Sequence, residues 1–214
     1  MNRKKNKLQI GIIDYGMGNI KSVSNAIELL GCDALLIDNP KFIKNPDAII
    51  LPGVGAFGEA MKSLNELCLI DPIKEVVLDL EKPLLGICLG MQLLATSSEE
   101  NGKNEGLSFI PGTVKKIPQK KSIRLPHVGW NEIELKNKSQ IFNDIKNRDS
   151  FYFVHSYRLE CEQEYVLATT NYGEDIIASV QSNNIFGMQF HPERSQQKGL
   201  HSLNNFINFV NKKC

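Results

Sequence analysis

A cysteine flanked by two glycines follows a short apolar run and stands before a helix-like pattern. The run covers residues 84–87, and Gly86-Ile87-Cys88-Leu89-Gly90 has the form glycine, any residue, nucleophile, any residue, glycine. This form is typical of a nucleophile elbow, in which a strand turns sharply into a helix and exposes a reactive side chain. The N-terminus of such a helix favours the thiolate. Taken alone, the elbow also allows a buried structural cysteine.

A histidine and a glutamate two positions apart, His191-Pro192-Glu193, follow a later apolar stretch. In extended chain, positions i and i+2 point to the same side. His191 can therefore face a nucleophile while Glu193 reaches the other imidazole nitrogen and fixes its tautomer. A lone histidine at a strand end is usually only hydrogen-bonded. Together with Cys88, however, the pair forms a nucleophile, a base and an orienting acid, which favours catalysis.

A glycine-rich loop, Pro52-Gly53-Val54-Gly55-Ala56-Phe57-Gly58, opens another helix-like stretch. Such a loop can present backbone N–H groups to a developing oxyanion, although a tight connection without chemistry explains it equally well. The turn 14–19 is a weaker candidate for nucleotide binding. It lacks the third glycine of the dinucleotide fingerprint, because Lys21 occupies that position.

Strands and helices must hold these groups in place, and their order predicts the fold class. In the first half, apolar runs at 8–13, 34–37, 48–51 and 84–87 alternate with helical patterns, including 71–80. This alternation predicts an α/β fold with an open, mostly parallel sheet covered by helices. The second half contains further expected strands at 112–117, 123–125, 132–135, 151–157, 165–170, 176–181 and 185–190. We expect them to add an antiparallel portion to the same sheet, with a hairpin at 182–184 and a final helix over 199–211.

The composition argues against several classes of protein. Lys and Arg number 25 against 24 Asp and Glu, so the net charge of +1 gives no field that would attract nucleic acid or a membrane. Five scattered cysteines argue against a disulfide framework or a zinc knuckle. Neither a signal peptide nor the ~20 apolar residues of a membrane span can be recognised. We expect one cytoplasmic domain over 1–214, with an ordered core of about 8–212.

The elbow and the His191-Pro192-Glu193 triplet resemble the class I glutamine amidotransferases, the triad-type glutaminases. Within that family the chain resembles the glutaminase subunits of imidazole glycerol phosphate synthases. Met91 after the elbow, where many sister amidotransferases carry His, is one discriminating feature. The blocks that carry the resemblance are Asp14-Tyr15-Gly16-Met17-Gly18-Asn19, Leu51 with the glycine-rich loop, 86–94, Pro126-His127-Val128-Gly129-Trp130-Asn131, Tyr152-Phe153-Val154-His155-Ser156-Tyr157 and 189–195.

The resemblance implies a flavodoxin-like sheet and the hydrolysis of glutamine to glutamate and ammonia, with neither metal nor organic cofactor. The ammonia would pass to a (β/α)₈ barrel cyclase subunit, the expected heterodimer partner in histidine biosynthesis. There it would react with a phosphoribulosyl-formimino aminoimidazole carboxamide ribonucleotide, giving imidazole glycerol phosphate and aminoimidazole carboxamide ribotide. Nucleic acid and membrane are not expected partners.

The resemblance also assigns roles to individual residues. Cys88 would attack the glutamine carboxamide, His191 would move the proton, and Glu193 would orient His191. His127 and His155 are expected to be structural or interfacial, since one base suffices. The other assigned residues fall into an oxyanion hole (Gly53, Val54, Gly55 and the Leu89 N–H), a glutamine-binding set (Gln92, Ser156, Tyr157) and a face toward the barrel (Asn19, Trp130, Arg194).

Two positions depart from the subfamily, because Arg194 stands where Lys is usual and Val128 where Met is common. Arginine keeps the charge but is not a compact ammonium, so these departures concern partner contacts rather than the triad. Family members are nearly silent alone, because the oxyanion loop is misoriented until the partner binds its nucleotide. We expect the same of the Gly53-Val54-Gly55 loop.

Three alternatives stay open. The chain could supply ammonia to another synthase, such as one that aminates a surface or flagellar sugar, because the triad would be the same. A pyridoxal-phosphate-synthase glutaminase is less favoured, since its elbow usually reads Cys-Ala-Gly. A catalytically inactive regulatory subunit is the third, and the intact Cys88, His191 and Glu193 argue against it.

Overall fold

A parallel sheet forms the centre of the computed structural model, which describes residues 7–120 and 123–213. Its inner strands are short apolar runs buried on both faces, as a sheet covered by helices requires, whereas the edge strand β2 is partly exposed. In spatial order the parallel strands are β2 (Asp33–Ile37), β1 (Gln9–Ile13), β3 (Ala48–Gly53), β4 (Leu84–Cys88) and β14 (Ile185–Met188).

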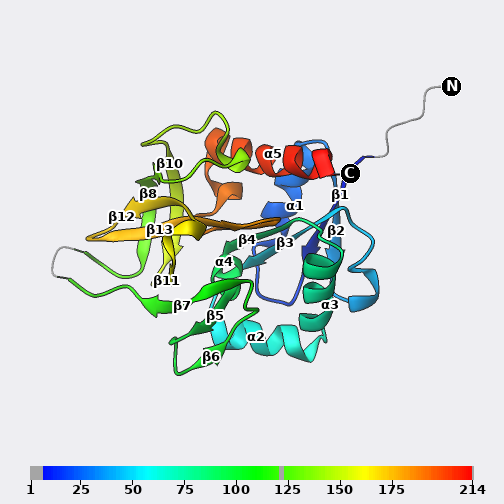
Figure 1. Ribbon diagram of the computed structural model, residues 1–214, viewed down its shortest axis with the longest axis horizontal. Coiled ribbons are helices and arrows are strands. Elements are labelled where there is room, and N and C mark those ends of the chain that lie inside the picture. Colours follow the sequence, from blue (N-terminus) through cyan, green and yellow to red (C-terminus); the bar gives the residue numbers. More distant parts are fainter. Residues whose placement is uncertain (1–6, 121–122, 214) are drawn as a thin grey trace.

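Helices cover both faces of this sheet (Figure 1). Strand β3 shows how, because successive side chains of a strand point to opposite faces. Ala48 and Ile50 pack in one core with α1 and α5, whereas Ile49 and Leu51 pack in the other with α2 and α3. The helices are α1 (Ile20–Leu29), α2 (Phe57–Glu66), α3 (Ile70–Lys74), the short α4 (Leu89–Leu93) and α5 (Gln196–Lys213).

Antiparallel strands extend the sheet beyond β14, as predicted. They are β13 (Asp175–Ser182), β12 (Val166–Asn171) and β9 (Glu134–Leu135), which complete an eight-stranded sheet. The predicted hairpin at 182–184 is confirmed between β13 and β14, where Asn183 has the left-handed φ of 52° that such turns need. The predicted fold class is therefore confirmed.

Other strands of the second half do not join that sheet, which corrects part of the expectation. The expected strand 151–157 is interrupted at Ser156, so its two parts belong to different small sheets. One pairs β10 (Ser150–His155) with β8 (His127–Glu132). The other contains β11 (Tyr157–Cys161), β7 (Ile110–Lys116), β5 (Ala95–Ser98) and β6 (Asn104–Glu105).

One local prediction was wrong, and another was right about the helix but not about its type. Residues 123–125 form no strand; they precede the cis peptide bond between Leu125 and Pro126. The expected helix 71–80 is α3 followed by a π-helical segment, Glu75–Asp79. Short 3₁₀ turns complete the described secondary structure at Pro40–Phe42, Gln140–Phe142, Gln163–Tyr165 and Pro192–Arg194. Within the described ranges, none of the helices is both long and apolar enough to cross a membrane.

Candidate active site

Cys88 occupies a strained turn between β4 and α4, in the predicted strand–turn–helix context. Its φ of 53° and ψ of −109° lie outside the regions that a side chain prefers, a strain of about 1–3 kcal/mol that functional sites commonly store. The flanking glycines let strand and helix approach. A Cβ on Gly90 would lie 1.7 Å from the Leu51 carbonyl oxygen, and one on Gly86 would lie 2.6 Å from the Gly90 carbonyl oxygen.

The neighbouring strands bring the other predicted groups to Cys88. Strand β3 pairs with β4 so that Gly53 lies opposite Cys88, and β14 flanks β4 on its other side. The chain leaves β14 and reaches His191, whose Nδ1 is 2.9 Å from Glu193 Oε1. The Glu193 side chain is fully buried. The structure therefore brings the three residues of the predicted triad together.

Asn19 also reaches this group. Its Nδ2 donates to Glu193 Oε1 at 3.1 Å, so one carboxylate oxygen accepts from both Asn19 and His191. The other oxygen, Oε2, is buried and has no hydrogen-bond partner among the residues that the structure describes. The sequence assigned Asn19 to the partner face by resemblance, and its contact with the orienting acid was missed.

The charge state of His191 follows from these neighbours. Burial opposes the imidazolium and lowers its pKa. The hydrogen bonds with Cys88 and with Glu193, and the negative charges that both can carry, act in the opposite direction and raise the pKa of His191 to about 10. This arrangement favours the imidazolium form of His191, so the ring can hold a proton beside the nucleophile.

A pocket of about 210 Å³ opens over Cys88. It collects residues from separate parts of the chain, and they include most of those predicted to act on glutamine. The pocket is lined by Val54, Gly55, Cys88, Leu89, Gln92, Glu100, Val154, His155, Ser156, Tyr157 and His191. Gly53 and Glu193 do not line it; Gly53 lies opposite Cys88 in the sheet and Glu193 holds His191.

Two amide side chains link the pocket to the nucleophile. Gln92 Nε2 donates to the Tyr157 carbonyl oxygen and to Gln189 Oε1, both at 3.0 Å. Gln189 Nε2 lies 3.9 Å from Cys88 Sγ, and Sγ lies 3.5 Å from the Val154 carbonyl oxygen. Sequence reasoning gave Gln189 no role, although its position two residues before His191 on the same strand end could have indicated one.

The expected oxyanion donor Val54 is engaged elsewhere in this structure. Its backbone N–H donates to the Met17 carbonyl oxygen at 3.3 Å. Gly55 beside it has a φ of 104°, which glycine adopts far more readily than other residues. The oxyanion role of the loop therefore stays a prediction, and it requires the Val54 N–H to leave Met17.

Glu100 was also missed by the sequence analysis. It lines the pocket, and its Oε2 accepts from the Phe57 N–H at the start of α2, at 2.7 Å. A carboxylate at this place can hold the positive α-ammonium of an amino acid. No local motif marks Glu100, because its position depends on the packing of β5 and β6 beside α2.

Two of the residues predicted to face the barrel, Trp130 and Arg194, lie together at the surface, whereas Asn19 is half-buried against Glu193. Trp130 is 49% exposed, and its ring meets that of Tyr152 edge-on at 6.1 Å. The Arg194 guanidinium lies over the same Tyr152 ring, 5.8 Å from its centre. Val128, on the same strand as Trp130, is 55% exposed. Their role toward a partner stays a prediction.

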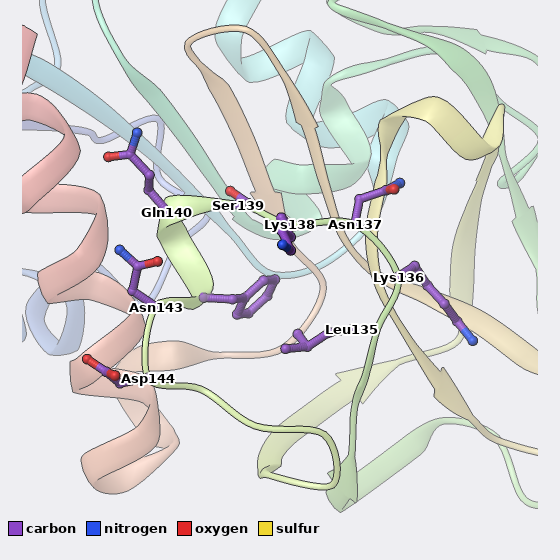
Figure 2. A pocket seen from close by; sticks show the side chains of 9 residues that line it. Leu135, Lys136, Asn137, Lys138, Ser139, Gln140, Asn143 and Asp144 are labelled. Atoms are coloured by element: carbon purple, nitrogen blue, oxygen red, sulfur yellow. The ribbon is translucent and has the colours of Figure 1, made fainter.

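A wider hollow of about 550 Å³ lies on the segment 135–144, beside α5 (Figure 2). None of the triad lines it, and its Ser139 hydroxyl is already bonded to Gln181 Oε1 at 2.6 Å. We therefore place the active site in the smaller pocket. Among the residues described, no group of three or more His, Cys, Asp or Glu side chains could hold a metal ion.

Several known proteins are similar to this chain in sequence. The chain is 47% identical over 198 residues to "Imidazole glycerol phosphate synthase subunit HisH 1" of Campylobacter jejuni (strain RM1221), which covers 92% of this chain and 98% of that protein. It is 48% identical over 204 residues to "Imidazole glycerol phosphate synthase subunit HisH 2" of Vibrio vulnificus (strain YJ016), with 95% of each covered.

Solved structures agree on the fold. "Crystal structure of glutamine amidotransferase" superposes with a TM-score of 0.73 at 19% identity, covering 94% of this chain and 98% of that one. "Structure of PurLQS from Thermotoga maritima" gives 0.74 at 17% identity, covering 95% and 99%. The family profile described as "Glutamine amidotransferase class-I" matches residues 11–209. This chain belongs to the class-I glutamine amidotransferase family.

Proposed function

We propose that this protein is the glutaminase subunit of an imidazole glycerol phosphate synthase. The observation that carries the proposal is that Cys88 and His191 line one pocket together with Gln92 and Glu100, while Glu193 holds His191 from behind. The 47% and 48% identity to curated subunits of that synthase supports the choice of client enzyme.

In the proposed reaction, His191 holds the thiol proton while Cys88 Sγ attacks the carboxamide carbon of glutamine. The C–N bond of the tetrahedral intermediate breaks as His191 gives the proton to the leaving nitrogen, which departs as ammonia. Water then attacks the thioester with His191 as its base, releasing glutamate and restoring the thiol. Glu193 keeps the His191 tautomer that each step needs.

Gln92, Ser156 and Tyr157 would hold the amino-acid end of glutamine, and the carboxylate of Glu100 would attract its ammonium group. The Val54 and Leu89 N–H groups would stabilise the oxyanion, at a value of ~3 kcal/mol for one such donor. Because the Val54 N–H is bonded to Met17 in this structure, turnover would be slow until that bond opens. This supports the expectation that the isolated chain is nearly inactive.

The partner would be a (β/α)₈ barrel cyclase that receives ammonia from this site. The exposed Val128 and Trp130, together with Arg194 and Tyr152, offer an apolar and aromatic surface of the kind that protein interfaces use. The free thiols of Cys32, Cys68, Cys88 and Cys161 suit a reducing cytoplasm.

The test is glutaminase activity with and without a histidine-pathway cyclase barrel and its nucleotide ligand. We expect strong stimulation by the loaded partner and complete loss in Cys88→Ala. Reaction of Cys88 with a glutamine-analogue affinity label, without stimulation by a folded barrel, would point to another synthase. Failure of Cys88 to react at all would contradict the glutaminase function.

A further inference from the structure

Two buried histidines have no part in the reaction above: His155, which lines the glutamine pocket, and His127, which lies beside it. His127 and His155 face each other across the β8–β10 pair. They are 3% and 5% exposed. Nδ1 of His127 lies 3.0 Å from Nε2 of His155. The direction of this hydrogen bond depends on which ring nitrogens carry protons. The hydrogen-bond partners of the two rings determine this, Asn131 at His127 and the Tyr157 carbonyl group at His155.

Asn131 determines which nitrogen of His127 carries the proton. The Glu132 backbone N–H donates to Asn131 Oδ1 at 2.9 Å, and Asn131 Nδ2 donates to the Asn171 carbonyl oxygen at 2.9 Å. Because an N–H can only donate and a carbonyl can only accept, the orientation of this amide is settled. Its Nδ2 lies 3.3 Å from His127 Nε2 and must donate to it, so His127 carries no proton on Nε2.

The Tyr157 carbonyl group determines which nitrogen of His155 carries the proton. His155 Nδ1 lies 2.8 Å from the Tyr157 carbonyl oxygen, so that nitrogen carries the proton. A neutral His155 accepts at Nε2, and His127 donates from Nδ1. Both ends thus require the same state, in which each histidine is neutral with its proton on Nδ1. Burial favours this neutral state, because it lowers the pKa of His127 to about 4 and that of His155 to about 3.

We infer that His127 and His155 are positioning residues of the glutamine site, which act by fixing the Tyr157 carbonyl group. That oxygen accepts from His155 Nδ1 and from Gln92 Nε2, so both of its lone pairs are used. The other Gln92 amide hydrogen goes to Gln189 Oε1. We call the hydrogen-bond chain from Asn131 through His127 and His155 to the Tyr157 carbonyl group the histidine relay. The relay therefore orients Gln92 so that its Oε1 is the atom left for a ligand.

The proton arrangement can be tested without any assay of function. Nitrogen-15 NMR of the histidines in the intact chain, assigned with His127→Gln and His155→Gln, should show both rings neutral and protonated on Nδ1 at about pH 7. The groups that face them are the stacked Tyr172 and Phe153 rings at His127, and the charge of His191 at His155. An Nε2–H tautomer or a charged ring at either position would overturn the relay.

The positioning role is tested with two variants of similar size, and it rests on the proposed function because the ligand is glutamine. In the complex with the cyclase barrel, His127→Leu leaves His155 Nε2 without a donor, and the KM for glutamine should rise about three- to tenfold with a smaller change in kcat. His127→Gln can still accept from Asn131 and donate to His155, so it should restore most of the KM.

A KM unchanged in His127→Leu would overturn the positioning role. So would an equal rise in both variants. If His127→Leu does not fold, the NMR measurement on the native chain still decides whether the relay exists. Failure of the proposed function would appear differently, as absence of glutaminase activity in the native complex.

Discussion

Asn19 and Glu193, 174 positions apart in the chain, share a hydrogen bond of 3.1 Å from the Asn19 amide to Glu193 Oε1. Asn19 precedes α1, a place where asparagine commonly caps the helix with its side chain. Here it makes no capping hydrogen bond. The amide is instead directed to the carboxylate that orients His191, so the start of α1 supports the catalytic base.

Asn19→Ala should lower the kcat of the partner-stimulated glutaminase roughly tenfold, because a buried carboxylate loses one of its donors. The KM for glutamine should change little, since Asn19 does not line the pocket. Asn25→Ala, an exposed asparagine on the same helix, is the matched control. If Asn19→Ala weakens only the binding of the barrel and leaves kcat intact, Asn19 serves the interface alone.

Glu193→Gln should lower kcat by roughly a hundredfold or more, because the side chain keeps its shape but loses the charge that stabilises the imidazolium. The pKa of His191 is raised in the native site, so the imidazolium persists into alkaline solution. Without the carboxylate that pKa falls, and the alkaline limb of the kcat profile should move to lower pH. An unshifted limb would show that Glu193 does not act on His191 electrostatically.

Gly90→Ala should destabilise the protein by about 3 kcal/mol or more, since its Cβ would collide with the Leu51 carbonyl group at 1.7 Å and neither backbone segment can move freely. Urea unfolding measures the loss. Gly102→Ala is the control, because no atom lies within 4 Å of its Cβ and only its positive φ is strained. Equal losses in the two variants would contradict the close approach of α4 to β3.

Val54→Gly should raise the glutaminase activity of the isolated chain several-fold, because a glycine allows the peptide to turn its N–H away from Met17 more readily. Val54→Ala also removes the exposed side chain but keeps the restricted backbone, and it should leave the basal rate near that of the native chain. If both variants behave alike, the side chain rather than the backbone controls the basal rate.

The buried histidines predict a dependence of stability on pH. The pKa values of His127 and His155 are lower in the folded chain, at about 4 and about 3, than the unfolded value of about 6.5. As the pH falls below the unfolded value, the unfolded chain binds protons first. The free energy of unfolding should decrease between about pH 6.5 and 4, by at most ~1.4 kcal/mol per pH unit for each histidine. A double His127→Gln, His155→Gln variant should show a flatter decrease.

The sequence predicted the parts of the site that local pattern determines. Cys88 could be recognised because an elbow needs glycines at fixed spacing, and His191 with Glu193 because two alternate positions share one side of a strand. The alternation of strands and helices likewise predicted the parallel sheet around β3 and β4.

The remaining parts depend on contacts between distant segments. Glu100 reaches the pocket only because β5 and β6 pack beside α2, and no spacing in the sequence records this. The interruption at Ser156 was missed for the same reason. Residues 151–157 read as one apolar strand, yet β10 and β11 pair with different partners, β8 and β7.

The register of the central strands determines which parts of the site can move independently. Gly53 is the last paired residue of β3 and lies opposite Cys88, while Met188 at the end of β14 lies opposite Ile87. The hydrogen-bonded ladder therefore holds Cys88 beside Gly53 and fixes the point at which the chain leaves β14, three residues before His191. Val54 comes one peptide after that ladder ends. In the proposed enzyme, the Val54 peptide can thus rotate away from Met17 while the pairing of β3 with β4 stays intact.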